Sequence, residues 1–228
     1  MAIYYFELDA HGAPGLLGSV LREFGQQVKQ IDVHRAATLP VDLDEVHGVV
    51  VSGGGASLTA SSGATEAFVR EAFKAEIPVL AIGAGARLAA RALGGEVSPS
   101  SERGIARVTL NGVGREEPIF AGQRWTSDQG VWNDECVSKL PPDARAFAST
   151  PGAKFAAWGL GPWVTALDWH PEWSAKELAE CAAGGSGAVT AQTANDVARL
   201  GRLFAERVSM TLMPVDRMNV GRGRDVRH

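Results

Sequence analysis

The sequence has only two cysteines, and this shortage excludes two classes of protein. Cys136 and Cys181 are too few for a disulfide framework and too far apart to suggest a metal clip. We expect both to be small hydrophobic residues, buried or half-buried, in a cytoplasmic protein. No apolar run is long enough to cross a bilayer. The opening residues, MAIYYFELDAHG, also lack the cationic flank and apolar stretch of a secretory signal.

An excess of positive charge is also missing. Lys and Arg number 22 against 26 Asp and Glu, which gives a formal net charge of −4. Binding of nucleic acid therefore has no electrostatic support from the sequence as a whole. Arginines do gather in residues 214–228. Because this tail has no helical or strand periodicity, it reads either as a frayed end or as a docking arm for a partner protein or a neighbouring subunit.

The rest of the chain, residues 1–213, is predicted to form one domain. With 45% apolar residues, it can bury a sizeable core. Its first half alternates β-rich runs with amphipathic helical patterns, which is typical of a parallel sheet covered by helices on both faces. The strands expected there are 3–8, 28–33, 77–82 and a buried strand within 48–55, and the helices are 15–24, 65–74 and 86–95.

From about residue 104 to residue 170 the pattern changes to short strands separated by turns. We expect an antiparallel extension there, and a return to helix after it. The expected strands are 104–110, 118–120, 144–150, 154–158 and 163–169, and the helices are 174–181 and 190–208. The predicted fold class is α/β, an open and mostly parallel sheet flanked by helices, with a small antiparallel extension.

Glycines follow two of the predicted strands. Gly53, Gly54 and Gly55 end the first of these strands, and they allow backbone amides to approach a ligand or a neighbouring loop closely. Gly83 follows the strand at 77–82 and precedes a helix. A strand, a sharp turn and a helix form a nucleophile elbow, which exposes a catalytic side chain at the turn.

Four segments in order resemble the motifs of class I glutamine amidotransferases, the glutaminase domains that feed ammonia to synthetases. Residues 50–55, VVSGGG, are similar to the V-S-G-G-P loop of that family. Residues 77–97 resemble the elbow I-P-V-L-G-I-C-x-G-x-Q-L with the A-L-G-G-x-V that follows it. The stretch 131–144 resembles W-H-x-D and L-P-x-x-A, and 168–172, DWHPE, resembles F-H-P-E. The resemblance implies a flavodoxin-like sheet.

The resemblance also implies roles for individual residues. His170 would be the general base, Glu172 would orient it, and the N–H groups of Gly54 and Ala84 would form an oxyanion hole. In the family a cysteine at the elbow attacks the amide of glutamine. That position falls on Gly83, which has no side chain and cannot form a thioester. The resemblance therefore predicts a protein without glutaminase activity.

Further positions depart from the family pattern in the expected substrate pocket. Arg87 stands where the family has the Gln that contacts glutamine, Asn133 where it has His, and Gly55 where it has Pro. With Gly53 and Trp169, these residues are the expected lining of the pocket. Arg87 would be able to clamp a carboxylate or a phosphate of a different ligand.

Three functions are compatible with these residues. The first is a non-catalytic or regulatory partner of a synthetase or another biosynthetic enzyme. The second is a repurposed hydrolase or transferase in which His170 and Glu172 activate water or a substrate hydroxyl. The third is a sensor that binds a metabolite beside Gly83. No metal or cofactor is expected, since the other histidines lack ligand spacing, and a second copy of the chain stays open as a partner.

Overall fold

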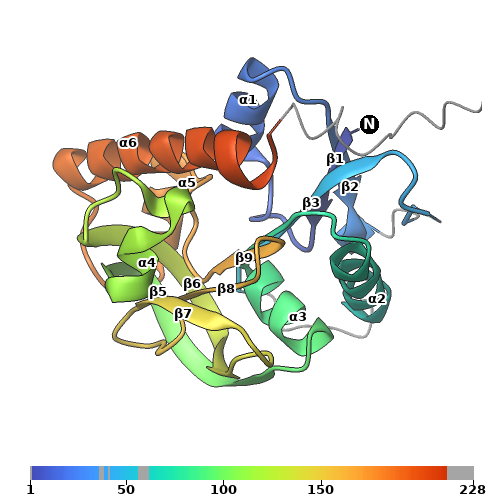
Figure 1. Cartoon of the computed structure of the whole chain (residues 1–228). Helices are drawn as coiled ribbons and strands as arrows, with labels where there is room; N and C mark the ends of the chain where they lie inside the picture. Colours follow the sequence, from blue (N-terminus) through green and yellow to red (C-terminus); the bar gives the residue numbers. More distant parts are fainter. Residues whose placement is uncertain (1, 36–38, 41, 56–61, 215–228) are drawn as a thin grey trace, which may run out of the picture.

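A computed structural model describes residues 2–35, 39–40, 42–55 and 62–214. In this part of the chain nine strands form one sheet in the order β2-β1-β3-β4-β9-β8-β7-β5-β6 (Figure 1). The strands are β1 (Ala2–Glu7), β2 (Val28–Asp32), β3 (Val46–Gly53), β4 (Val79–Gly83), β5 (Glu96–Leu110), β6 (Thr126–Lys139), β7 (Arg145–Ser149), β8 (Ala157–Leu160) and β9 (Val164–Leu167). The helices are α1 (Gly15–Glu23), α2 (Ser62–Lys74), α3 (Ala84–Ala92), α4 (Gly112–Glu116), α5 (Ala175–Ala183) and α6 (Ala191–Arg207), with short turns η1 (Val33–Arg35), η2 (Pro118–Phe120) and η3 (Val208–Leu212).

The parallel part of the sheet consists of β2, β1, β3, β4 and β9. Helices α1 and α6 cover one face and α2 and α3 cover the other (Figure 1). Every residue of β3 and β4 is buried, because these strands have helices on both sides. Their continuous apolar runs, which predicted buried strands, are the expected consequence of this double cover.

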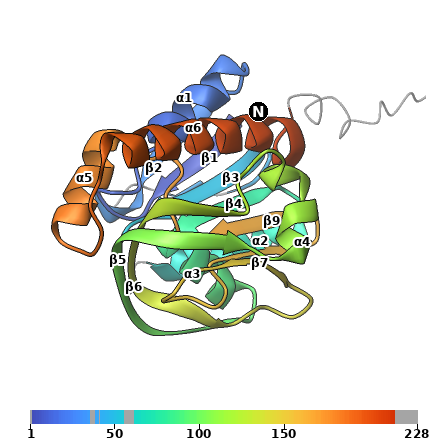
Figure 2. The same ribbon diagram turned by 90° about the vertical axis from the view of Figure 1, so that its left-hand side faces the viewer.

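The antiparallel part joins β9 to β8, β7, β5 and β6. Its largest unit is the long hairpin of β5 and β6 (Figure 2), so this part is longer than the short strands expected. Strand β6 was not predicted, because only one of its faces is buried and its sequence is largely polar. The strand expected at 118–120 is wrong: these residues form the single turn η2, since Pro118 has no N–H to donate to a ladder.

The fold class predicted from the sequence is confirmed, and the expected helices and most of the other strands are found within a few residues of their predicted bounds. The exception is the strand expected at 104–110, because β5 already begins at Glu96. None of the described helices combines the length and the apolar content needed to span a membrane. The predicted tail falls outside the described residues from position 215 onward.

The carboxyl ends of β3, β4 and β9 meet at one edge of the sheet. In the register of the parallel strands Gly53 lies opposite Gly83, and Ile82 lies opposite Leu167. The loops that leave these strands therefore begin side by side. Ligands of open α/β sheets bind at this edge, and it carries most of the residues that the sequence singled out.

Candidate functional site at the carboxyl edge of the sheet

Gly83 lies at the tip of a sharp turn between β4 and α3. It is the last residue of the strand and the N-cap of the helix, with φ 57° and ψ −118°. L-residues rarely adopt this conformation, and holding one there costs about 1–3 kcal/mol. The strand, turn and helix expected around Gly83 are thus present, in a backbone conformation that favours glycine.

His170 lies beside this turn and is fixed from several sides. Its Nδ1 lies 2.8 Å from Glu172 Oε1, and the same carboxylate oxygen accepts a hydrogen bond of 2.9 Å from Ser52 Oγ. The indole of Trp173 stacks on the imidazole, with ring centroids 3.9 Å apart and an interplanar angle of 2°. Both His170 and Glu172 are fully buried. If Glu172 accepts from Nδ1–H, the second ring nitrogen carries a free lone pair, as a general base requires.

The second nitrogen, Nε2 of His170, is buried without a hydrogen-bond partner among the described residues and faces Gly83. A Cβ atom at position 83 would lie 2.5 Å from Cε1 and 2.7 Å from Nε2 of His170, and it would overlap the carbonyl oxygen of Gly53. Carbon atoms in contact normally lie about 3.5–4.0 Å apart. The space that a nucleophilic side chain would need at this turn is therefore already filled.

The glycine loop after β3 does not present its amide to this centre. The N–H of Gly54 donates to Asp9 Oδ1 at 3.0 Å, so the donor expected for an oxyanion hole is engaged elsewhere. Ala84, the other expected donor, is the first residue of α3. Its N–H belongs to the first helical turn, whose N–H groups have no acceptor within the helix.

Arg87 and Asn133, both expected to contact a substrate, bond to each other. Arg87 Nη1 donates to Asn133 Oδ1 at 2.8 Å, and Nη2 donates to the carbonyl of Gly54 at 2.9 Å. Both side chains are buried, and the guanidinium is fully so. Burial lowers the pKa of Arg87, while nearby carboxylates, Asp168 first among them, oppose the shift. Arg87 therefore acts as an internal brace of the glycine loop in this structure.

Trp132 covers the same loop from outside. A Cβ atom at Gly55 would overlap the indole Nε1 of Trp132, so only glycine allows this close approach. The indole contacts the guanidinium of Arg103, 3.6 Å from its centroid, and the ring of His11, with centroids 4.3 Å apart. Neither Arg103 nor His11 was identified from the sequence, because both lie outside the matched motifs and meet Trp132 only in the folded chain.

Comparison with known proteins identifies the family. A sequence model described as glutamine amidotransferase class-I matches residues 14–180, most of the chain. This chain belongs to the class I glutamine amidotransferase family. The curated relatives include GMP synthases (glutamine-hydrolysing) from Aeropyrum pernix, 32% identical over 167 residues, and from Flavobacterium psychrophilum, 27% identical over 166 residues. These matches cover 69% and 67% of this chain but only 30% and 32% of the relatives, so the chain spans about a third of their length.

Solved structures agree with this class I amidotransferase fold. A glutamine amidotransferase from Methylobacillus flagellatus has a TM-score of 0.80 at 21% identity, covering 100% of this chain and 98% of that one. Another, from Thermotoga maritima, has a TM-score of 0.77 at 17% identity, covering 93% and 99%. At these identities the likeness establishes the fold of the amidotransferase domain and no more.

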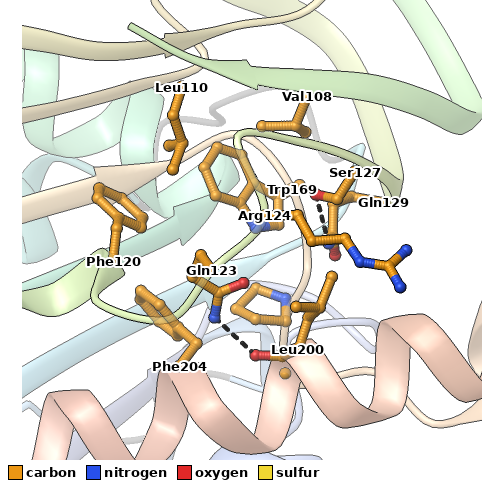
Figure 3. Close-up of a pocket in the computed structure, with 12 residues that line it drawn as sticks. Val108, Leu110, Phe120, Gln123, Arg124, Ser127, Gln129, Trp169, Leu200 and Phe204 are labelled. Carbon is orange, nitrogen blue, oxygen red and sulfur yellow. Dashed lines mark hydrogen bonds between the residues drawn. The ribbon is translucent and has the colours of Figure 1, made fainter. Parts of the chain in front are cut away.

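Trp169 of the amidotransferase fold belongs to the core cluster that also contains Phe120 and Phe204. Neighbouring residues of an extended chain point to opposite faces, so Trp169 faces a pocket beneath α6 (Figure 3). That pocket is about 10 Å³ in volume, which is about the room of one water molecule. Neither Gly83 nor His170 lines this pocket, and the expectation that Trp169 lines a substrate site beside Gly83 stays a prediction. Its aromatic neighbours in the pocket are Phe120 and Phe204.

Each of the two thiols in this amidotransferase-family chain has a polar neighbour within the chain. Cys181 Sγ donates to the carbonyl of Val131 at 3.1 Å, and burial raises the pKa of this thiol, which disfavours the reactive thiolate. Cys136 Sγ lies 3.7 Å from Ser98 Oγ across the β5–β6 hairpin. Among the described residues no cluster of three or more His, Cys, Asp or Glu side chains is arranged to hold a metal ion.

Asp168 is a buried acid that the sequence did not single out. Its side chain is 1% exposed, and neither carboxylate oxygen has a hydrogen-bond partner in the described residues. Burial raises the pKa of Asp168 from 3.8 to about 7, although Arg87 acts in the opposite direction. The carboxyl group is therefore neutral in the folded protein at mildly acidic pH, where it would be ionised in the unfolded chain.

This raised pKa predicts how stability depends on pH. Because the folded state binds the proton more tightly, the contribution of Asp168 is fully present below about pH 4 and is lost as the pH rises to about 7. Asp168→Asn removes this titration. Between pH 5 and pH 8 the wild type should therefore lose about 2–3 kcal/mol of unfolding free energy that the variant does not lose. Urea unfolding at both pH values measures the difference, and parallel pH profiles for the two proteins would contradict the prediction.

Proposed function

We propose that this amidotransferase-family protein does not hydrolyse glutamine and is a cytoplasmic, non-catalytic or regulatory partner of a biosynthetic enzyme. The observation that carries the proposal is the filled space at Gly83. A thioester needs a thiol on this turn, whereas the turn has no side chain and the Gly53 carbonyl and the His170 ring occupy the place of a Cβ atom. We assign Gly83 to the position of the family's nucleophile on the motif order around it.

The class of partner follows from the relatives. These are glutamine-hydrolysing GMP synthases, and this chain matches about a third of their length. A synthetase that requires an amino group is therefore the partner proposed. An amidotransferase domain without turnover would stabilise such an enzyme or regulate its supply of ammonia.

A repurposed enzyme is the second candidate, and one observation favours it. Hydrogen bonds of 2.9 and 2.8 Å connect Ser52 to Glu172 and Glu172 to His170. It would suit a base that activates water or a hydroxyl group. Against this candidate, His170 is fully buried, and the Gly54 N–H, one of the two expected oxyanion donors, bonds to Asp9.

His170→Ala in the native host separates the two candidates. A non-catalytic partner does not use the imidazole for chemistry, so we expect the variant to support growth and formation of the pathway product as wild type does. Deletion of the gene is the reference for complete loss. A variant that is present at the wild-type level and yet behaves like the deletion would contradict the proposal and favour the repurposed enzyme.

A further inference from the structure

We infer that Asp9 is a positioning residue that holds the Gly53–Gly54 peptide with its carbonyl toward the elbow and its N–H away from it. The inference rests on the proposed function in one respect, namely that Gly83 marks the nucleophile position. It adds a second obstacle to acyl transfer at Gly83, namely the orientation of the Gly53–Gly54 peptide. This obstacle is separate from the missing side chain. The side chains that fix the peptides before and after Gly54 are those of Asp9 and Arg87.

The two ends of one peptide unit give its orientation. The peptide bond is planar and trans, so its carbonyl and its N–H point in opposite directions. The oxygen of Gly53 would overlap a Cβ atom on Gly83, and the nitrogen of Gly54 donates to Asp9 Oδ1 at 3.0 Å. The acceptor of this peptide therefore faces the elbow, and its donor faces the loop after β1.

Asp9 is itself held in place to accept this bond. The same oxygen, Oδ1, accepts the N–H of His11 at 2.9 Å, and the main-chain carbonyl of Asp9 accepts the N–H of Gly12 at 3.1 Å. On the other side of the loop, Arg87 Nη2 donates to the carbonyl of Gly54 at 2.9 Å. The peptides before and after Gly54 are thus fixed by opposite charges, a carboxylate on the N–H and a guanidinium on the carbonyl. Bonds with one charged partner are about twice as strong as neutral ones.

This orientation opposes acyl-transfer chemistry. A tetrahedral intermediate needs donors at its oxyanion, and losing one donor lowers kcat about 10²–10³-fold. Here a carbonyl oxygen faces the reacting position, so the local dipole has the wrong sign for an oxyanion. A side chain restored at position 83 would also have to displace this carbonyl, and the rotation of the peptide would break the bond from Gly54 to Asp9.

The coupling between positions 9 and 83 is the test, and it needs no catalysis. Gly83→Ala forces the Gly53 carbonyl to move, so part of its cost is the loss of the bond to Asp9. In an Asp9→Ala background that bond is already absent. We expect the fall in Tm caused by Gly83→Ala to be smaller there, by roughly 3–10 °C, than in the wild-type background. Equal falls in the two backgrounds would overturn the inference.

Two matched variants test whether the coupling between positions 9 and 83 is specific to the bond between Asp9 and Gly54. Asp9→Asn keeps an acceptor oxygen for the Gly54 N–H but removes its charge, so the cost of Gly83→Ala in that background should lie between its costs in wild type and in Asp9→Ala. Gly85→Ala places a methyl group of the same size on the same helix, where it would overlap the carbonyl of Val51, which Asp9 does not hold. Its cost should add to that of Asp9→Ala, and a coupling as large as that of Gly83 would overturn the inference.

Hydrogen exchange of the Gly54 amide in the unmodified protein gives a second measurement, which stays readable if a variant fails to fold. We expect this amide to be protected, and to lose protection in Asp9→Ala but to keep it in Asp9→Asn. Exchange at the rate of an exposed amide in wild type would overturn the inference. Glutamine turnover by wild type would refute the proposed function instead, so the two failures are distinguishable.

Discussion

Gly83→Ala is expected to lower the free energy of unfolding by about 2–5 kcal/mol, which for a chain of this size is a fall in Tm of roughly 5–15 °C. Two causes add. The backbone of Gly83 has φ 57° and ψ −118°, a conformation that strains any residue with a Cβ atom. The methyl group would also overlap the Gly53 carbonyl and crowd the ring of His170, and main-chain atoms of a buried strand move only at a cost.

Gly112→Ala is the matched control for this change. Gly112 is the first residue of α4, and a Cβ atom there would meet nothing within 4 Å. Alanine is a better helix former than glycine, so this variant should be neutral or more stable by up to about 1 kcal/mol. Thermal unfolding of both variants measures the contrast. If Gly83→Ala were as mild as Gly112→Ala, the turn would be open, and the structural basis for inactivity would be lost.

The sequence predicted the parallel half of the fold well, because its signals are local. Strand β4 is a continuous apolar run that ends in glycine, β3 carries three consecutive valines and also ends in glycine, and each is followed by a turn. The positions of Gly83, His170 and Glu172 followed from motif order alone. Their contact follows from topology, since parallel strands end at the same edge of a sheet.

The residues that the sequence did not reveal act through long-range contacts. Asp9 follows β1 and meets Gly54 only after the sheet has formed. Asp168 becomes unusual only through burial. Trp169 was grouped with its neighbour His170, whereas its contacts with Phe120 and Phe204 form only in the folded chain. Arg87 was expected to hold a ligand, but its partners Asn133 and Gly54 belong to the protein itself.

The second large effect concerns activity: wild-type protein should release ammonia from glutamine no faster than the uncatalysed reaction does. In a serine protease, loss of the nucleophile alone lowers kcat about 10⁶-fold. Here the turn at Gly83 offers no thiol, and the Gly53 carbonyl faces the reacting position. Arg87, which stands where the family has the Gln that contacts glutamine, is bonded within the protein, which is a further reason to expect no turnover of glutamine.

Ammonia release from millimolar glutamine, measured for purified wild type and for His170→Ala side by side, tests the central claim most directly. The proposed function predicts that both proteins give the same signal as buffer. Release above buffer by wild type that disappears in His170→Ala would mean that the imidazole serves a working nucleophile, and it would contradict the assignment of this chain as a non-catalytic amidotransferase.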